Sequence, residues 1–212
     1  MHQRSNWWHG SLALLLYLLS TAAAFASPDF HPLPPSCNTA CVSPYGDVLG
    51  MSSQGTKAYS NCKADCVIAE PNRENAIYSG IKWQCVEYAR RWLIQNRGLT
   101  FGDVDTAADI WKIETYTQLG DRSEIFVSNQ LNGSTQLPQQ GDLLIYAKEF
   151  LGTGHVAVVI EVDKVKGLLK VGEQNYENKK WPANYARSIP FIQKDDRYWV
   201  LDAYLLGWKQ SH

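Results

Sequence analysis

The sequence lacks an excess of charge of either sign, and it lacks any run of basic residues. Its 212 residues carry 20 Lys and Arg against 21 Asp and Glu, a formal net charge of -1. Nucleic acids and anionic membrane surfaces are bound by basic patches or stripes, and no such footprint is present. We therefore expect no nucleic acid and no membrane surface among the partners, and we expect a monomer.

Internal repeats and low-complexity tracts are also absent, and only one stretch is apolar enough to suggest a membrane. Ser11–Ala26 is a largely apolar run that follows Arg4 and ends in an A-x-A cleavage pattern, Ala24-Phe25-Ala26. Its strongly apolar part is shorter than the roughly 20 residues of a spanning helix. The sequence thus predicts a signal peptide over residues 1–26 and a secreted or periplasmic protein, cleaved after Ala26. A retained anchor is the alternative.

The rest of the chain has an ordinary globular composition, since 45% of all residues are hydrophobic and 19% are charged. A chain of this length forms one domain by default. The Pro-rich segment SPDFHPLPPS cannot form regular structure, so we expect a Pro/Cys-rich lead over residues 27–41 and one domain over residues 42–212.

Cysteine is scarce, and its spacing is informative. The five cysteines are Cys37, Cys41, Cys62, Cys66 and Cys85. The first four form two C-x3-C pairs, which are typical either of two disulfides or of a tetrathiolate zinc site. Export favours disulfides, and nested pairing of Cys37 with Cys66 and of Cys41 with Cys62 is the simplest geometry. Cys85 then has no partner: it is either a buried small hydrophobe or a reactive thiol.

Hydrophobic periodicity places helices before strands. Residues 84–97 have helical spacing and end at Gly98, and residues 105–118 are expected to form a second helix. Strand patterns follow at residues 142–147, 155–162, 168–174 and 198–204. This order predicts an α+β domain with N-terminal helices packed on a mostly antiparallel sheet. Cys85 falls in the first helical turn, where unpaired N–H groups and the helix dipole stabilise a thiolate.

Histidine, the usual base for a cysteine nucleophile, is also scarce. Of the five histidines, only His155 lies within the predicted folded body; the others are His2, His9, His31 and His212. His155 opens the strand HVAVVIEV just after Gly154. A structural histidine with local hydrogen bonds is the plainer interpretation, but its uniqueness favours a catalytic base.

Hairpin geometry supplies candidates to orient that base. The segments 155–162 and 168–175 are joined by a short turn, and facing residues in an antiparallel pair have a constant sum of numbers. A turn centred near residue 164 or 165 places His155 opposite Glu173 or Asn175, unless a bulge shifts the register. Either residue is therefore a candidate to hold the imidazole.

These residues carry a family resemblance. The motifs WQCVEYARRW, GTGHVAVVIEV and VGEQN, in that order, resemble the CHAP amidase superfamily and, more narrowly, the amidase domain of glutathionylspermidine synthetase/amidase. The resemblance runs from about Val42 to Trp208. It implies a papain-like (CHAP/NlpC-P60-type) α+β fold. The family's glutathionylspermidine enzymes are cytosolic and carry a large ligase domain, whereas this chain has the predicted signal and four extra cysteines.

The resemblance also implies a role for each site residue. The nucleophile falls on Cys85, the base on His155, the orienting carboxylate on Glu173 and a fourth polar position on Asn175. Gln84 falls on the oxyanion site. Metal and organic cofactors are not required by this chemistry.

Two arginines and one tryptophan are further candidates for substrate binding. Arg90 and Arg91 follow Glu87 at helical spacing, so surface ion pairs are one interpretation. By resemblance Arg90 instead meets a substrate carboxylate in the cleft. Trp83, with Gly152 and Gly154 near His155, is expected to form a narrow slot that admits glycyl or small acyl residues.

Three functions are compatible with these residues. The first is a secreted cysteine amidase or endopeptidase that cleaves peptidoglycan peptides through a thioester. The second is a hydrolase of a small glycyl or γ-glutamyl amide such as glutathionylspermidine. The third is a non-catalytic binding module, which is disfavoured because every candidate catalytic position is filled.

Overall fold

The computed structural model describes residues 37 and 40–211. The predicted signal peptide and its cleavage site, most of the Pro-rich lead, and His212 lie outside this range. Within it, no helix is both long and apolar enough to cross a membrane.

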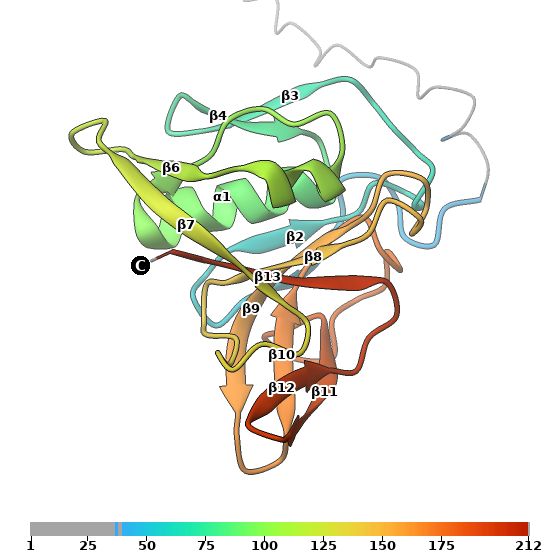
Figure 1. Cartoon of the computed structure of the whole chain (residues 1–212). Helices are drawn as coiled ribbons and strands as arrows, with labels where there is room; N and C mark the ends of the chain where they lie inside the picture. Colours follow the sequence, from blue (N-terminus) through green and yellow to red (C-terminus); the bar gives the residue numbers. More distant parts are fainter. Residues whose placement is uncertain (1–36, 38–39, 212) are drawn as a thin grey trace, which may run out of the picture. The chain divides into compact units, whose positions relative to one another are not determined.

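Antiparallel strands make up most of the described fold (Figure 1). Nine strands form one sheet in the order β12-β11-β10-β9-β8-β13-β7-β6-β5, and two separate hairpins pair β1 with β2 and β3 with β4. The strands in chain order are β1 (Val48–Met51), β2 (Lys57–Tyr59), β3 (Pro71–Glu74), β4 (Ile77–Ile81), β5 (Leu99–Thr100), β6 (Thr115–Gln118), β7 (Glu124–Leu131), β8 (Leu143–Tyr146), β9 (Val156–Asp163), β10 (Leu168–Gly172), β11 (Arg187–Lys194), β12 (Arg197–Val200) and β13 (Leu205–Ser211).

One α-helix, α1 (Cys85–Arg97), lies between the β3–β4 hairpin and the sheet (Figure 1). It ends as its sequence predicts, because Gly98 takes the left-handed conformation at φ 62° and its N–H donates a hydrogen bond to the Leu93 carbonyl. Its apolar side chains pack against β8 and β9. This packing fixes the N-terminal turn of the helix, and with it Cys85, close to the start of β9.

The sheet is buried on both faces where it carries the site. Alternate residues of β8 and β9 enter two separate cores, as the period of two in a strand requires. Val156 and Val158 pack toward α1, whereas Ala157 and Val159 pack toward β10, β11 and β13. All four are fully buried, so the strand that follows His155 is rigidly held.

The structure has fewer helices than the sequence predicts: α1 is the only α-helix among the described residues, where several were expected to pack on the sheet. The helix predicted over residues 105–118 is instead a short 3-10 helix, η2 (Ala107–Lys112), followed by β6. A capping box between Thr106 and Asp109 begins this short helix. Beyond it, Thr115-Tyr116-Thr117 alternates and pairs with β7 as a strand.

Strand boundaries are correct in the middle of the chain and wrong near its end. The predictions for β8, β9 and β10 agree with the observed strands to within two residues. The strand predicted over 198–204 is really the end of β12, a turn and the approach to β13, because Tyr204 has a positive φ of 63°. The strands β1 to β7, β11 and β13 were not predicted.

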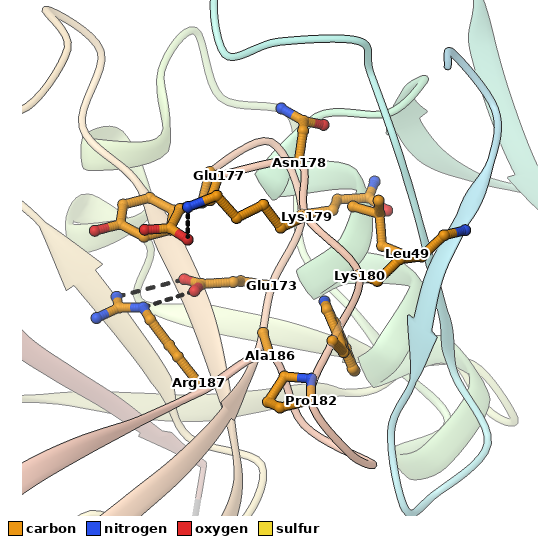
Figure 2. A pocket seen from close by; sticks show the side chains of 12 residues that line it. Leu49, Glu173, Glu177, Asn178, Lys179, Lys180, Pro182, Ala186 and Arg187 are labelled. Atoms are coloured by element: carbon orange, nitrogen blue, oxygen red, sulfur yellow. Dashed lines mark hydrogen bonds and ion pairs between the residues drawn. The ribbon is translucent and has the colours of Figure 1, made fainter. Parts of the chain in front are cut away.

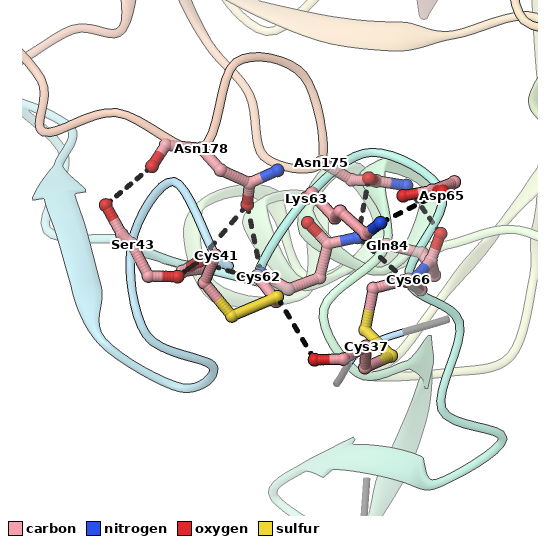
Figure 3. Close-up of a disulfide and its surroundings, with 12 residues drawn as sticks. Cys37, Cys41, Ser43, Cys62, Lys63, Asp65, Cys66, Gln84, Asn175 and Asn178 are labelled. Atoms are coloured by element: carbon pink, nitrogen blue, oxygen red, sulfur yellow. Dashed lines mark hydrogen bonds and ion pairs between the residues drawn. A yellow bond between two sulfur atoms is a disulfide. The ribbon is translucent and has the colours of Figure 1, made fainter. Parts of the chain in front are cut away.

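Two disulfides hold the segment that precedes the β1–β2 hairpin against the loop that follows it. They join Cys37 to Cys66 and Cys41 to Cys62, which is the nested pairing (Figure 3). Cys85 is the one free cysteine in the described part of the chain. The tetrathiolate zinc alternative therefore does not describe this structure.

Peptide mapping of the protein under non-reducing conditions should find these two linkages. Strong reductant should lower the free energy of unfolding by about 3 kcal/mol per disulfide, since the loops closed span 29 and 21 residues. Chemical denaturation with and without reductant measures the change. Four free thiols with stoichiometric zinc would contradict the assignment.

Candidate active site

Cys85 is the first residue of α1, and its side chain is nearly buried, at 7% exposure. The preceding residue, Gln84, is extended and is the N-cap. The backbone N–H of Cys85 lies in the first turn, so it has no acceptor within the helix. The thiol and an unpaired N–H therefore lie together at the positive end of the helix dipole.

His155 is the partner of Cys85. Cys85 interacts with the imidazole closely enough to raise its pKa, and the imidazole Nε2 lies 2.9 Å from Glu173 Oε2. Because Nε2 is taken by the carboxylate, Nδ1 is the ring nitrogen left for the thiol. The imidazole thus lies between the thiol and the carboxylate.

The imidazole is buried, yet its charged form is favoured. Burial lowers the pKa of His155, but the hydrogen bonds and charges of Cys85 and Glu173 outweigh it and raise the pKa to about 9. Aromatic rings of Tyr146, Phe150 and Tyr176 surround the imidazole, with centroids 5.4–6.1 Å from its own. They limit access of water, which strengthens the interaction of the imidazolium with its two partners.

Glu173 is kept ionised by a residue that lies behind it. Burial would raise the pKa of Glu173, but His155 and Arg187 together hold it below the ordinary value. Arg187 Nε donates to Glu173 Oε1 at 2.7 Å, and its Nη1 donates to Asp202 at 2.7 Å. Figure 2 shows the guanidinium facing the carboxylate. Arg187 thus holds the Glu173 carboxylate in position, and the carboxylate in turn holds the imidazole of His155 in position.

The contact of His155 with Glu173 rather than with Asn175 follows from where β10 ends, not from the register of the β9–β10 hairpin. Paired residues sum to 331 near the turn and to 330 after a register shift between Lys170 and Val171. Continued pairing would bring Asn175 opposite His155, but β10 ends at Gly172 and Glu173 reaches the imidazole. Asn175 instead donates to Gln84 Oε1 at 2.5 Å.

A cavity of about 470 Å³ gives access to Cys85 and His155. Gln84 and Asn175 also line it. Most of its walls are apolar, formed by Val67, Ile81, Val86, Val104 and Leu151 among others. Three carboxylates, Asp65, Asp103 and Asp105, lie along it and are exposed to solvent. A ligand here meets an apolar floor and an acidic rim.

The two arginines of α1, Arg90 and Arg91, have different contacts. Arg91 forms the ion pair with Glu87, at 2.7 Å between Nε and Oε1, and this pair is buried. Arg90 lines the cavity, donates to the Ser79 and Gly102 carbonyls, and lies 3.3 Å from Asp103. The helical ion pair thus belongs to Arg91, and the cavity position to Arg90.

Trp83 does not line this cavity. It stacks on Tyr59, with ring centroids 4.2 Å apart, in a different pocket that also contains Arg91. The expected slot between Trp83 and the glycines is therefore wrong. Gly154 does line the cavity, and it must be glycine, because its φ is +72° and a Cβ would lie 2.5 Å from the Tyr146 carbonyl oxygen. Gly152 has no such contact.

Sequence reasoning missed two parts of the site. Arg187 and Asp202 lie on or beside β11 and β12, which are remote in sequence from the motifs, so only the folded sheet brings them to Glu173. The acidic rim was also missed, because its members come from separate loops. An isolated Asp or Arg on a loop carries no periodic signal.

Comparison with known proteins places these residues in context. The model of the CHAP domain matches residues 76–175, a span that includes Gln84, Cys85, His155, Glu173 and Asn175 but not Arg187. Trypanothione synthetase of Crithidia fasciculata is 32% identical over 160 residues, covering 75% of this chain and 24% of that protein. Bifunctional glutathionylspermidine synthetase/amidase of Escherichia coli is 31% identical over 183 residues, covering 78% and 29%. The chain thus spans less than a third of the length of these relatives.

The titration of His155 tests the chain of three side chains. Cys85→Ala removes the hydrogen bond and charge that raise the pKa of His155, and Glu173→Gln removes the charge on its other side. In each variant the imidazolium should therefore lose its proton at lower pH than the native midpoint near 9. NMR of the ring protons, assigned with His155→Ala, measures the midpoint. A midpoint that neither substitution moves would contradict the contacts described.

Proposed function

The chain contains a CHAP domain over residues 76–175 and is homologous to the amidase domain of glutathionylspermidine synthetase/amidase, and we propose that it is a cysteine-dependent amidohydrolase. The observation that carries this proposal is the arrangement of Cys85, His155 and Glu173: the thiol and the imidazole line one cavity and interact, and Glu173 bonds the imidazole from its other side. A non-catalytic module would have no need of a buried free thiol paired with a buried imidazolium, because that arrangement costs desolvation without adding apolar packing.

The proposed reaction begins with the Cys85 sulfur as the nucleophile. The thiolate, with His155 as its imidazolium partner, attacks the amide carbonyl carbon, and the C=O π electrons move onto oxygen. The backbone N–H of Cys85 and the Gln84 side chain stabilise that oxyanion, an effect worth about 3 kcal/mol per donor.

Proton transfer by His155 completes the cycle. The imidazolium gives its proton to the amide nitrogen as the C–N bond breaks, so the amine leaves and a thioester remains. Water then attacks the thioester and gives a proton to His155. The acid leaves, and the thiolate–imidazolium pair is restored.

The shape and charge of the cavity bear on the substrate. Its walls are mostly apolar, and Asp105 on its rim favours a substrate with a cationic group, whereas Asp65 and Asp103 are paired with Lys63 and Arg90. The exported chain predicted from the sequence, with its two disulfides, supports peptidoglycan peptides, whose diamino acids carry amines. The similarity to glutathionylspermidine synthetase/amidase supports the second candidate, a glycyl amide of a polyamine. The protein is proposed to act as a monomer, outside the cytoplasm.

Incubation with both substrates distinguishes the two. The mature protein should release new amines from purified peptidoglycan or from glutathionylspermidine, identified by mass spectrometry. Cys85→Ala should abolish release, and Glu173→Gln should lower kcat by about a hundredfold, because the imidazolium loses its charged partner. Circular dichroism controls for folding. Residual activity of more than a few per cent in Cys85→Ala would remove the nucleophile assignment.

The acidic rim makes a separate prediction. For an amide with a cationic leaving group, Asp105→Asn should lower kcat/KM by about twofold to fivefold, which is the size of one exposed charge pair, and added salt should reduce the difference. Asp121→Asn is the matched control, because Asp121 is also exposed but does not line the cavity. Equal kcat/KM values for cationic and neutral leaving groups would show that the rim carboxylates do not contribute to substrate specificity.

A further inference from the structure

Four polar groups beside the nucleophile form a closed ring of hydrogen bonds. Asn61 Nδ2 donates to the Cys66 carbonyl at 3.0 Å and to Asn175 Oδ1 at 2.6 Å. Asn175 Nδ2 donates to Gln84 Oε1 at 2.5 Å. Gln84 Nε2 donates to the same Cys66 carbonyl at 3.2 Å, which closes the ring. Figure 3 shows Cys66, Gln84 and Asn175 beside the two disulfides.

One member of the ring sets the direction of all the others. A side-chain amide can be turned over and still make hydrogen bonds, but a backbone carbonyl can only accept. The Cys66 carbonyl therefore requires an N–H from Gln84 and an N–H from Asn61. Gln84 must then point its oxygen at Asn175, which must donate, and Asn175 must accept from Asn61. No amide in the ring can turn over without bringing two acceptors together.

The carbonyl that sets this direction is itself fixed. Cys66 is fully buried and is joined to Cys37 by a disulfide. Asn61 is also fully buried, and its backbone N–H donates to Asn178 at 3.0 Å. The disulfide thus constrains the loop that presents the Cys66 carbonyl to both amides.

The ring leaves one donor for a ligand. The Gln84 amide nitrogen carries two N–H bonds, and among the described residues its one acceptor is the Cys66 carbonyl. Gln84 lines the cavity with Cys85. Resting on the proposed amidohydrolase function, we propose that this ring, anchored on the Cys37–Cys66 disulfide, positions the Gln84 N–H as the oxyanion donor, with Asn61 and Asn175 as positioning residues.

A kinetic cycle tests whether Asn175 acts through Gln84. Asn175→Ala should lower kcat about tenfold and change KM less than threefold, because the donor is needed most in the transition state. Gln84→Ala should lower kcat about a hundredfold. In the Gln84→Ala background, Asn175→Ala should have no further effect. Equal fold-losses in both backgrounds would overturn the proposal. Asn132→Ala is the matched control, since Asn132 bonds the backbone of Val200 outside the cavity.

The rate of Cys85 alkylation distinguishes an effect of the ring on the oxyanion donor from an effect on the reactivity of the thiol. Displacement by iodoacetamide at Cys85 forms no oxyanion, so its rate in Asn175→Ala and Gln84→Ala should remain within twofold of the native rate. Slower alkylation in Asn175→Ala would mean that Asn175 acts on the Cys85–His155 pair, which overturns the proposal. If the native protein cleaves neither substrate, the proposed function fails instead. NMR of the Gln84 side-chain amide then still tests the ring: its two protons should be distinct and slow to exchange, and Asn175→Ala should make them exchange fast.

The disulfide has its own test. The double variant Cys37→Ser/Cys66→Ser keeps the Cys66 backbone carbonyl but releases its loop. Its kcat should fall about as far as that of Asn175→Ala, and this loss should also vanish in the Gln84→Ala background. A kcat equal to that of the native protein would remove the disulfide from the proposal.

Discussion

The burial of two carboxylates, Glu173 and Glu87, is the constraint on which the rest of the site depends. A buried charge must be paired and hydrogen-bonded, or it destabilises the fold. Glu173 is paired with His155 and Arg187, and Glu87 accepts from Arg91, Asn72, Ser79 and Gln174. The two networks meet at one tripeptide, Glu173-Gln174-Asn175. Its three side chains bond to His155, to Glu87 and to Gln84 in turn, so the segment that follows β10 links the imidazole, the helix and the N-cap into one arrangement.

This arrangement explains how a helix terminus and a strand terminus are kept in register. Gln174 Nε2 also donates to the Gln84 backbone carbonyl at 3.0 Å, directly before Cys85. Displacement of the tripeptide would break these hydrogen bonds and leave a buried charge without its partners, which costs several kcal/mol. The position of Cys85 is therefore maintained by electrostatics in the interior as much as by apolar packing of α1. The disulfide-bonded loop adds a second restraint on Gln84, through the Cys66 carbonyl.

Much of this site was predictable because its residues are rare in the chain. Only one cysteine falls outside the two C-x3-C pairs, and only one histidine falls in the folded body, so Cys85 and His155 followed from counting. The helix from Cys85 to Gly98 and the central strands followed from periodicity. The second helix failed because Thr115–Gln118 could satisfy either pattern, and pairing with β7 decided for the strand. Such tertiary pairing outweighs local propensity.

The sequence by itself determined the chemistry: a thiol at a helix start, an imidazole at a strand start and a carboxylate after the partner strand. Only the tertiary structure decided how these groups are held. The end of strand pairing at Gly172, which residue counting does not reveal, lets Glu173 reach the imidazole and Asn175 bond to Gln84. Arg187 and the Cys66 carbonyl reach the site from distant segments. Periodicity is a local property of the chain, whereas the pairing of buried charges and amides depends on which segments meet, and that is settled only when the sheet has formed.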